Sequence, residues 1–446
     1  MSRVLIVGAG ISGLTTAWFL KQKGREVQVL EAAPDPGGSL HSLSDEGFLC
    51  DLGANSTLAR GDLMADLAAS VGLGGDVLEA NPAAKKRFIV RHGALQPLPA
   101  GPGAFLSTRL FSPKAKLRLM LEPFIGRGDH EESIADFVAR RLGAEFRDWA
   151  IDPFVSGVYA GDPYKLSVRA ATGKIYALEA GYRSLFIGAL ARLIQRKTSG
   201  PMPAGKLVGL RSGMQSLPLA LSQALGDAVR AGEPAEALSR GEDGVWTART
   251  SGGEYSAEQL VLALPAHECA GLLRPLDATL ADELDAIDYP PVATVALGFR
   301  REQVRHPLDG FGALIPRLLN IPTLGALFSS TLFPGRAPEG HVLITAFLGG
   351  ARNRSVADME ESAIIGQVVK DLAELLGIEG DPVFSRSLLW REAIPQYEIG
   401  HLERIARVDE RLGALPGLHV RANWRDGISV SDCLTNAHDL AQSMPE

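Results

Sequence analysis

Three glycines near the start of the chain have the spacing of a phosphate-binding turn. They follow VLIV (4–7), an apolar run typical of a buried parallel strand, and precede a segment with helical spacing. In such a strand–turn–helix unit the first glycine makes the turn, the second lets the main chain approach a diphosphate, and the third allows close helix packing. The three glycines are Gly8, Gly10 and Gly13. They predict a nucleotide-binding unit.

An acidic residue completes this unit. The next apolar run, VQVL (27–30), ends on Glu31, where a carboxylate accepts hydrogen bonds from ribose hydroxyls. NAD and FAD share the signature, but a second glycine pair and the stretch FLCDLGANS (48–56) favour the longer cofactor, FAD. The residues predicted to bind FAD in this part of the chain are Gly8, Ala9, Gly10, Ile11, Ser12, Gly13, Glu31, Ala32, Gly37, Gly38, Gly53, Ala54, Asn55 and Ser56.

Motifs for other chemistry are absent from the sequence. We find no Ser-His-acid order, no HExxH, no metal-spaced His/Cys cluster and no P-loop, and His41, His267 and His401 are isolated. A flavin can accept a hydride directly, so the cofactor carries the reaction while the protein places the substrate. We therefore expect no catalytic side chain and no metal ligand.

Composition limits the class of protein. With 446 residues, of which 46% are hydrophobic, the chain can form two or three domains. Its formal net charge of −7 argues against a nucleic-acid partner, and three distant cysteines favour a reducing, cytoplasmic location. The glycines interrupt the apolar start of the chain, so we interpret it as mature protein. No run of about 18 apolar residues predicts a transmembrane helix.

Longer stretches carry a resemblance to a known family. The chain resembles the flavin amine-oxidase superfamily and, within it, the protoporphyrinogen oxidases, in the same order from residue 3 to about residue 443. Besides the glycine motif, the matching stretches are VSGVYAGDPYKLSVRAATGKIYALE (155–179), GFGALIP (310–316), TLGALFSSTLFPGRAPEG (323–340), IPQYEIGHLERI (394–405) and NWRDGISVSDCLTNA (423–437).

This resemblance implies an α/β fold (α+β overall) with interleaved domains. A Rossmann-like FAD-binding domain assembled from three segments is expected beside a mixed-sheet substrate domain and a helical insertion. The expected segments are 1–80, 206–265 and 386–446 for FAD binding, 81–102 and 266–385 for substrate binding, and 103–200 for the helical insertion, which is also the part expected to associate with a membrane.

The implied reaction is the six-electron oxidation of protoporphyrinogen IX to protoporphyrin IX. Three two-electron hydride transfers reduce FAD, and O2 reoxidises the flavin to give hydrogen peroxide. Coproporphyrinogen III oxidation by the same chemistry, a flavin amine oxidase or desaturase relative, and a non-catalytic porphyrin-binding protein are the alternatives. Amine oxidases usually carry an aromatic pair before the flavin, and here only Trp424 is a candidate.

The resemblance also assigns residues. Arg87 is expected to pair with a propionate, Phe311 and Leu314 to pack on pyrrole rings, and the Gly157 carbonyl to meet pyrrole N–H groups. The remaining FAD contacts are expected at Ala235, Asn423, Ile428, Ser429 and Val430. The family usually has glycine where Ala422 stands, and often glycine or lysine where Asp426 stands. A carboxylate at 426 would repel the diphosphate of FAD unless Arg421 or Arg425 neutralises it or it points to solvent.

Residues 103–124 (GAFLSTRLFSPKAKLRLMLEPF) interleave apolar side chains with Arg109, Lys114, Lys116 and Arg118. This pattern suits peripheral binding to an anionic membrane, and equally two helices packed on the substrate domain with basic outer faces. We expect a cytoplasmic protein with peripheral membrane contact. The oligomeric state stays open, with a homodimer as one option.

Overall fold

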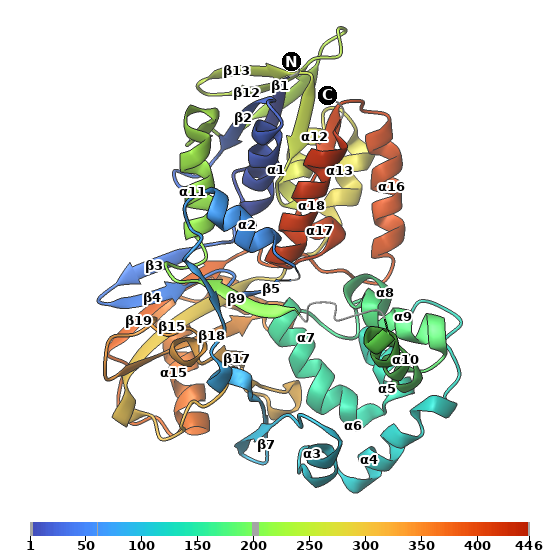
Figure 1. Cartoon of the computed structure of the whole chain (residues 1–446), viewed down its shortest axis with the longest axis vertical. Helices are drawn as coiled ribbons and strands as arrows, with labels where there is room; N and C mark the ends of the chain where they lie inside the picture. The colour runs from blue at the N-terminus through green and yellow to red at the C-terminus, as the bar shows by residue number, and fades with distance from the viewer. Residues whose placement is uncertain (1–2, 60, 199–204, 445–446) are drawn as a thin grey trace.

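The computed structural model describes residues 3–59, 61–198 and 205–444, and all structural statements refer to these. Three predicted domain segments, 1–80, 103–200 and 386–446, end in residues that lie outside the described ones: 1–2, 199–200 and 445–446. Figure 1 shows a layered upper body above a large twisted sheet on one side and a group of helices on the other. The predicted fold class is confirmed.

A five-stranded parallel sheet forms the core of the upper body, in the order β10-β2-β1-β14-β20. Val4, Leu5 and Ile6 of its central strand are at most 1% exposed, because both faces of the sheet are covered. The strands come from three widely separated parts of the chain: β1 (Arg3–Val7), β2 (Glu26–Glu31), β10 (Val229–Ala231), β14 (Gln259–Leu262) and β20 (Leu418–Val420).

Helices cover one face of this sheet, and a small antiparallel sheet with further helices covers the other. The first face packs against α1 (Ile11–Gln22), α2 (Leu63–Ser70), α11 (Ser216–Leu225) and α18 (Val430–Ser443). The second packs against β11 (Ala237–Arg240), β12 (Trp246–Thr250), β13 (Gly253–Ala257), α12 (Ala266–Leu273), α13 (Ala278–Asp285) and α16 (His401–Gly413).

The lower body contains a seven-stranded mixed sheet in the order β19-β15-β18-β17-β16-β7-β8. Its strands are β7 (Arg87–Arg91), β8 (Ala94–Pro97), β15 (Val292–Arg300), β16 (Gly312–Leu314), β17 (Thr323–Leu327), β18 (His341–Gly349) and β19 (Phe384–Trp390), and α15 (Glu361–Leu376) packs on one face. Only β16 and β7 run parallel, with Gly312 opposite Arg87.

Two small sheets join the bodies. One is the hairpin of β3 (Ser42–Asp45) and β4 (Phe48–Asp51), and the other has the order β5-β9-β6. The strands of the second are β5 (Thr57–Ala59), β6 (Val77–Glu79) and β9 (Lys206–Leu210).

Residues 102–198 form the helical insertion. Its core includes Arg141, which is fully buried and pairs with Glu122 at 3.0 Å and with Glu179. Glu122 also accepts the Leu185 amide at 2.8 Å, so this ionic cluster fixes the start of the last helix. The helices are α3 (Pro102–Ser107), α4 (Pro113–Met120), α5 (Ile134–Arg141), α6 (Ala144–Phe146), α7 (Asp152–Tyr159), α8 (Val168–Ala171), α9 (Gly173–Tyr182) and α10 (Leu185–Thr198).

The structure places two predicted segment boundaries elsewhere. Helices α12 and α13, assigned to the substrate domain, pack against Leu5 and Leu262 of the nucleotide-binding sheet. Strand β19 runs across the predicted boundary between 385 and 386, because it pairs along β15 from Phe384 to Trp390. The other predicted boundaries stay predictions.

Candidate active site

The glycine motif forms the turn between β1 and α1. Gly8 has a φ of +104°, and a Cβ on it would lie 2.6 Å from the Ala263 oxygen. A Cβ on Gly13 would lie 2.0 Å from the Gly8 oxygen, so the helix rests directly on the turn. Gly10 differs, because its φ is −70° and an added Cβ would meet no atom closer than 4.0 Å. The fold needs Gly8 and Gly13, whereas Gly10 keeps a space open.

Glu31 points its carboxylate at this turn from the end of β2. Its Oε2 accepts the Ala9 amide at 2.6 Å and its Oε1 accepts the Ala33 amide at 2.8 Å. A carboxylate has about four acceptor positions, so capacity for ribose hydroxyls remains. The predicted neighbour Ala32 is exposed beside it.

Gly37 and Gly38 form the opposite wall of the turn. The Gly37 amide donates to the Ala9 oxygen at 3.0 Å. Gly38 has a φ of +57°, and its Cβ would lie 3.3 Å from the Gly10 Cα. Main chain therefore lines this groove from both sides, and a diphosphate can reach amide groups there.

The loop 53–56 follows β4 and packs on the same wall. The Ala54 amide donates to the Ser39 oxygen at 3.2 Å, and a Cβ on Gly53 would lie 1.9 Å from that oxygen. Asn55 closes the loop by donating its side-chain amide to the Gly53 oxygen at 2.8 Å. Ser56 is half-buried at the end of the loop.

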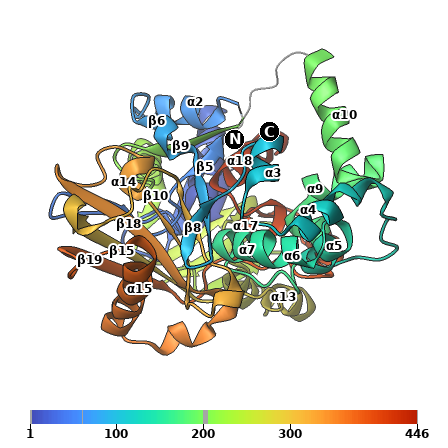
Figure 2. The same ribbon diagram turned by 90° about the horizontal axis from the view of Figure 1, so that it is seen from below.

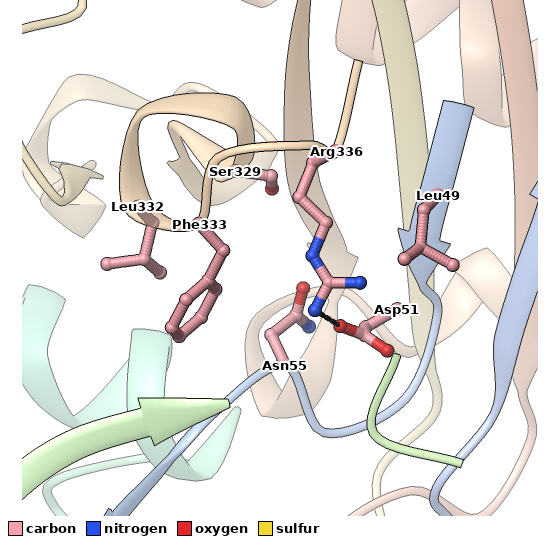
Figure 3. Close-up of a pocket in the computed structure, with 7 residues that line it drawn as sticks. All are labelled: Leu49, Asp51, Asn55, Ser329, Leu332, Phe333 and Arg336. Carbon is pink, nitrogen blue, oxygen red and sulfur yellow. Dashed lines mark ion pairs between the residues drawn. The ribbon is translucent and has the colours of Figure 1, made fainter. Parts of the chain in front are cut away.

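A buried ion pair that the sequence did not predict supports this loop. Asp51 and Arg336 are 2.7 Å apart, and each side chain is 3% exposed (Figure 3). Asp51 also accepts from Ser42 at 2.6 Å and from the Met214 amide at 2.8 Å, while Arg336 donates to the Leu210 oxygen at 3.0 Å. The pair ties the lower body to the cofactor loop. Arg336 lies in the matched stretch TLFPGRAPEG, but no local sequence pattern indicated its partner Asp51.

A small pocket lies beside this pair. It holds about 10 Å³, which is room for one water, between Asn55, Phe333 and Arg336 (Figure 3). The second guanidinium nitrogen of Arg336, Nη1, is buried without a hydrogen-bond partner among the described residues.

The C-terminal loop meets the loop 53–56. Helix α17 (Asn423–Asp426) precedes Ile428, and Ser429 begins α18 by accepting the Asp432 amide on its Oγ at 3.1 Å. The Ser431 amide donates to Thr57 Oγ1 at 3.0 Å. This hydrogen bond joins two groups of predicted FAD contacts. One group is the loop 53–56, and the other is Asn423, Ile428, Ser429 and Val430.

The two unusual residues of this loop fit their positions. Ala422 has an extended main chain, with a φ of −149° that any residue adopts. Asp426 pairs with Arg421 at 2.8 Å and with Arg425 at 3.1 Å, so its charge is neutralised. Neither residue opposes a diphosphate in the groove.

Ala235 lies in the irregular link between β10 and β11, on the far side of Glu31. Two residues before it, the Glu233 amide donates to the Glu31 oxygen at 2.8 Å. This link is therefore adjacent to the expected ribose site. The adenine of FAD is attached to that ribose, so it is expected near Ala235. Together with the open space at Gly10 and the main-chain groove, the residues present fit a dinucleotide such as FAD.

Tyr397 had no predicted role, and Trp424 was the single candidate for the aromatic pair of an amine oxidase. The Tyr397 hydroxyl donates to the Asn423 oxygen at 2.5 Å and accepts the Gly427 amide at 2.9 Å. Burial raises its pKa above the usual range. The matched stretch IPQYEIGH contained Tyr397 without a role. Trp424 is fully buried and donates to the Leu264 oxygen at 3.1 Å, so it forms no aromatic wall before a flavin.

The four predicted substrate residues form two pairs of neighbours. Strand β16 pairs with β7 so that Gly312 lies opposite Arg87. The Arg87 guanidinium therefore lies near the residue before Gly312, 5.2 Å from the centre of the Phe311 ring. A Cβ on Gly157 of α7 would lie 2.4 Å from Leu314 Cδ2, so these two residues are in contact. The Arg87–Phe311 pair and the Gly157–Leu314 pair are two separate contacts, because Phe311 and Leu314 belong to different apolar clusters.

Two neighbouring cations already have carboxylate partners. Lys86 pairs with Asp309, and Arg352 pairs with Asp152 at 2.8 Å. Arg87 is exposed, and no carboxylate of the described residues pairs with it. A substrate carboxylate can therefore bind Arg87 without displacing another group.

Comparison with known proteins decides the family. The family described as flavin containing amine oxidoreductase matches residues 11–442. The chain belongs to this family. A chloroplastic protoporphyrinogen oxidase of Nicotiana tabacum is 34% identical, with 99% of this chain and 85% of the relative covered. A coproporphyrinogen III oxidase of Bacillus subtilis is 29% identical over 97% of this chain and 95% of that protein.

Among solved structures, a provisionally assigned protoporphyrinogen oxidase from Exiguobacterium sp. 255-15 superimposes with a TM-score of 0.85. It is 27% identical and covers 99% of this chain and 98% of its own. Membership of the flavin amine oxidoreductases makes the chain an FAD-dependent oxidoreductase, so the predicted cofactor is confirmed. Within the described residues no group of three metal-ligating side chains and no helix able to cross a membrane is found.

Proposed function

We propose that the chain oxidises protoporphyrinogen IX to protoporphyrin IX in the cytoplasm. The substrate loses six hydrogens, and three O2 molecules become three hydrogen peroxide molecules. The name of the tobacco relative and the coverage of both chains support the proposed reaction. The observation that carries it is Arg87, an exposed cation beside the Phe311 ring that has no carboxylate partner among the described residues.

Bound FAD supplies the hydride acceptor, and the glycine turn, Glu31 and the C-terminal loop would hold it. Phe311 and Leu314 provide apolar contact for a flat macrocycle, and an aromatic face adds about 0.5–1.5 kcal/mol beyond area burial. Arg87 can bind a propionate through two parallel hydrogen bonds, which orients the ring. Gly157 lets Leu314 pack directly on α7, because a Cβ there would lie 2.4 Å from Leu314 Cδ2, and its carbonyl is the group proposed to meet the pyrrole N–H groups.

The two candidate porphyrinogens differ in the number of carboxylates that the protein must bind. Coproporphyrinogen III carries four carboxylates, which require several free cations around the ring. Lys86 and Arg352 are held by Asp309 and Asp152, so Lys85 and Arg87 are the cations of the basic cluster 85–87 without an ion pair among the described residues. This balance favours the dicarboxylate substrate.

An aerobic fluorescence assay of both porphyrinogens with the purified flavoprotein tests the proposal. We expect faster turnover of protoporphyrinogen IX, and about a tenfold higher KM for Arg87→Ala with little change in kcat, since one charge-assisted contact is lost. Lys86→Ala is the control, because Lys86 already pairs with Asp309. Preference for coproporphyrinogen III, or an unchanged KM, would contradict it, and a colourless protein that takes up no flavin would favour a non-catalytic porphyrin binder.

We further propose that the helical insertion touches an anionic membrane. Phe124 is 84% exposed, and Leu117 and Met120 are also exposed on α4. Helix α10, whose start packs on Glu122, adds further exposed apolar side chains at the edge of the molecule (Figure 2): Phe186, Ile187, Leu190 and Leu193. Of the predicted cations, Lys116 and Arg118 donate to main-chain oxygens, which leaves Arg109 and Lys114 for lipid.

Flotation with anionic liposomes at low salt tests this contact. Met120→Ser combined with Phe124→Ser should reduce the floating fraction several-fold, because apolar burial drives interfacial binding. Leu219→Ser, which removes an exposed leucine of α11, should not change it. Wild-type protein that stays entirely in the soluble fraction would contradict the contact.

A further inference from the structure

The segment 396–401 is bound on one side to the helical insertion. The Tyr397 oxygen accepts the Ser167 amide at 2.8 Å, and the Gly400 amide donates to Glu131 Oε2 at 3.0 Å. The Ser167 hydroxyl donates to the other oxygen of Glu131. The main chain of this segment is therefore fixed to α8 and to the strand-like link before α5.

On its other side the same segment holds the C-terminal loop. The hydroxyl of Tyr397 donates to the Asn423 oxygen at 2.5 Å and accepts the Gly427 amide at 2.9 Å. These bonds join the first residue of α17 to the residue after its end. Tyr397 is 5% exposed, so water cannot easily replace the hydroxyl in either bond.

The Tyr397 ring is also fixed. It stacks on His401 with ring centres 4.3 Å apart and planes 12° apart. At the other end of the loop, Gly427 has a φ of +130°, and a Cβ on it would lie 2.7 Å from Asp432 Cβ. The loop main chain thus has a conformation that other residues rarely adopt, with one side-chain group bonded to both of its ends.

We infer that Tyr397 is a positioning residue for FAD: its hydroxyl sets where the main chain of residues 423–428 faces the cofactor, and its own main chain links that loop to the helical insertion. The inference rests on the proposed placement of FAD against this loop. It does not depend on which porphyrinogen reacts.

Tyr397→Phe tests the inference because it keeps the stacked ring and removes both hydrogen bonds. FAD is stripped from the holoenzyme, and the dissociation constant is measured by titration with flavin fluorescence, together with the visible spectrum of the bound flavin. We expect about tenfold weaker binding and a changed flavin spectrum. Tyr159→Phe is the matched control, since the Tyr159 hydroxyl donates at 2.6 Å to the Ala171 oxygen within the helical insertion.

The outcomes separate positioning from simple stability. A lower melting temperature of the Tyr397→Phe apoprotein with unchanged FAD affinity and spectrum would overturn the inference, as would equal losses of affinity in Tyr397→Phe and Tyr159→Phe. Wild-type protein that binds FAD without oxidising porphyrinogen would refute the proposed function alone. Wild-type protein that binds no FAD would refute both.

Discussion

Replacing Gly10 with alanine separates what the fold needs from what the ligand needs. The main chain at Gly10, with φ −70° and ψ 176°, suits alanine, and the nearest atom to the new Cβ would lie 4.0 Å away. The apoprotein should keep its stability or gain up to about 1 kcal/mol, because the unfolded chain loses freedom. The methyl group would fill the space where a diphosphate approaches the first amides of α1. Losing two hydrogen bonds to a charged group costs roughly 3–6 kcal/mol, which weakens FAD binding at least about 100-fold.

Thermal unfolding of the apoprotein and titration with FAD measure the two effects. Gly271→Ala is the control, because Gly271 lies in the middle of α12 with open space around its Cα, so stability should rise while FAD affinity stays the same. Gly13→Ala should instead destabilise the apoprotein, since its Cβ would lie 2.0 Å from the Gly8 oxygen. A dissociation constant of Gly10→Ala within threefold of wild type would refute the reasoning, because nothing would then approach Gly10.

Three further outcomes follow from buried contacts. Asp51→Asn leaves Arg336 as an unpaired buried charge and should lower the free energy of unfolding in urea by roughly 3–5 kcal/mol, whereas a loss below about 1 kcal/mol would contradict a structural role for the pair. Gly157→Ala pushes Leu314 away and should raise the KM for porphyrinogen several-fold with stability little changed; an unchanged KM would place the substrate elsewhere. Burial lowers the pKa of His401 to about 4, so between pH 6.5 and 4 the unfolded chain binds the extra proton. Unfolding free energy should therefore fall by on the order of 3 kcal/mol over this range, and less in His401→Phe; equal pH slopes would contradict this.

The sequence predicted best what neighbouring residues determine. VLIV, the three glycines and Glu31 form one continuous strand–turn–helix–strand unit, so spacing alone indicated their arrangement. The pairing of β1 with β14, and of β14 with β20, depends on contacts between segments that are distant in sequence. Only the family resemblance indicated this assembly. The apolar spacing of α12 and α13 shows that they cover a sheet, but it does not say which sheet, so their domain was misplaced.

Side-chain partners were the hardest feature to predict. Arg336 and Tyr397 act on loops that are far from them in sequence, and no local pattern marks such contacts. Trp424, the single candidate for the aromatic pair of an amine oxidase, is buried in the core, so its indole does not support that alternative. Whether Asp426 would be neutralised could not be decided either, because that required the positions of Arg421 and Arg425.

The order of strands in the parallel sheet also has a consequence for biosynthesis. β1 leaves the ribosome long before its partner β14, and β20 and α18 follow only within the last 30 residues or so of the chain, at 418–420 and 430–443. At roughly 5–20 residues per second, translation from the glycine turn to α18 takes on the order of 20–90 s. Throughout that interval the nascent chain exposes an unpaired strand edge prone to aggregation. With FAD placed against the C-terminal loop as proposed, the binding site is complete only after this last segment has been synthesised.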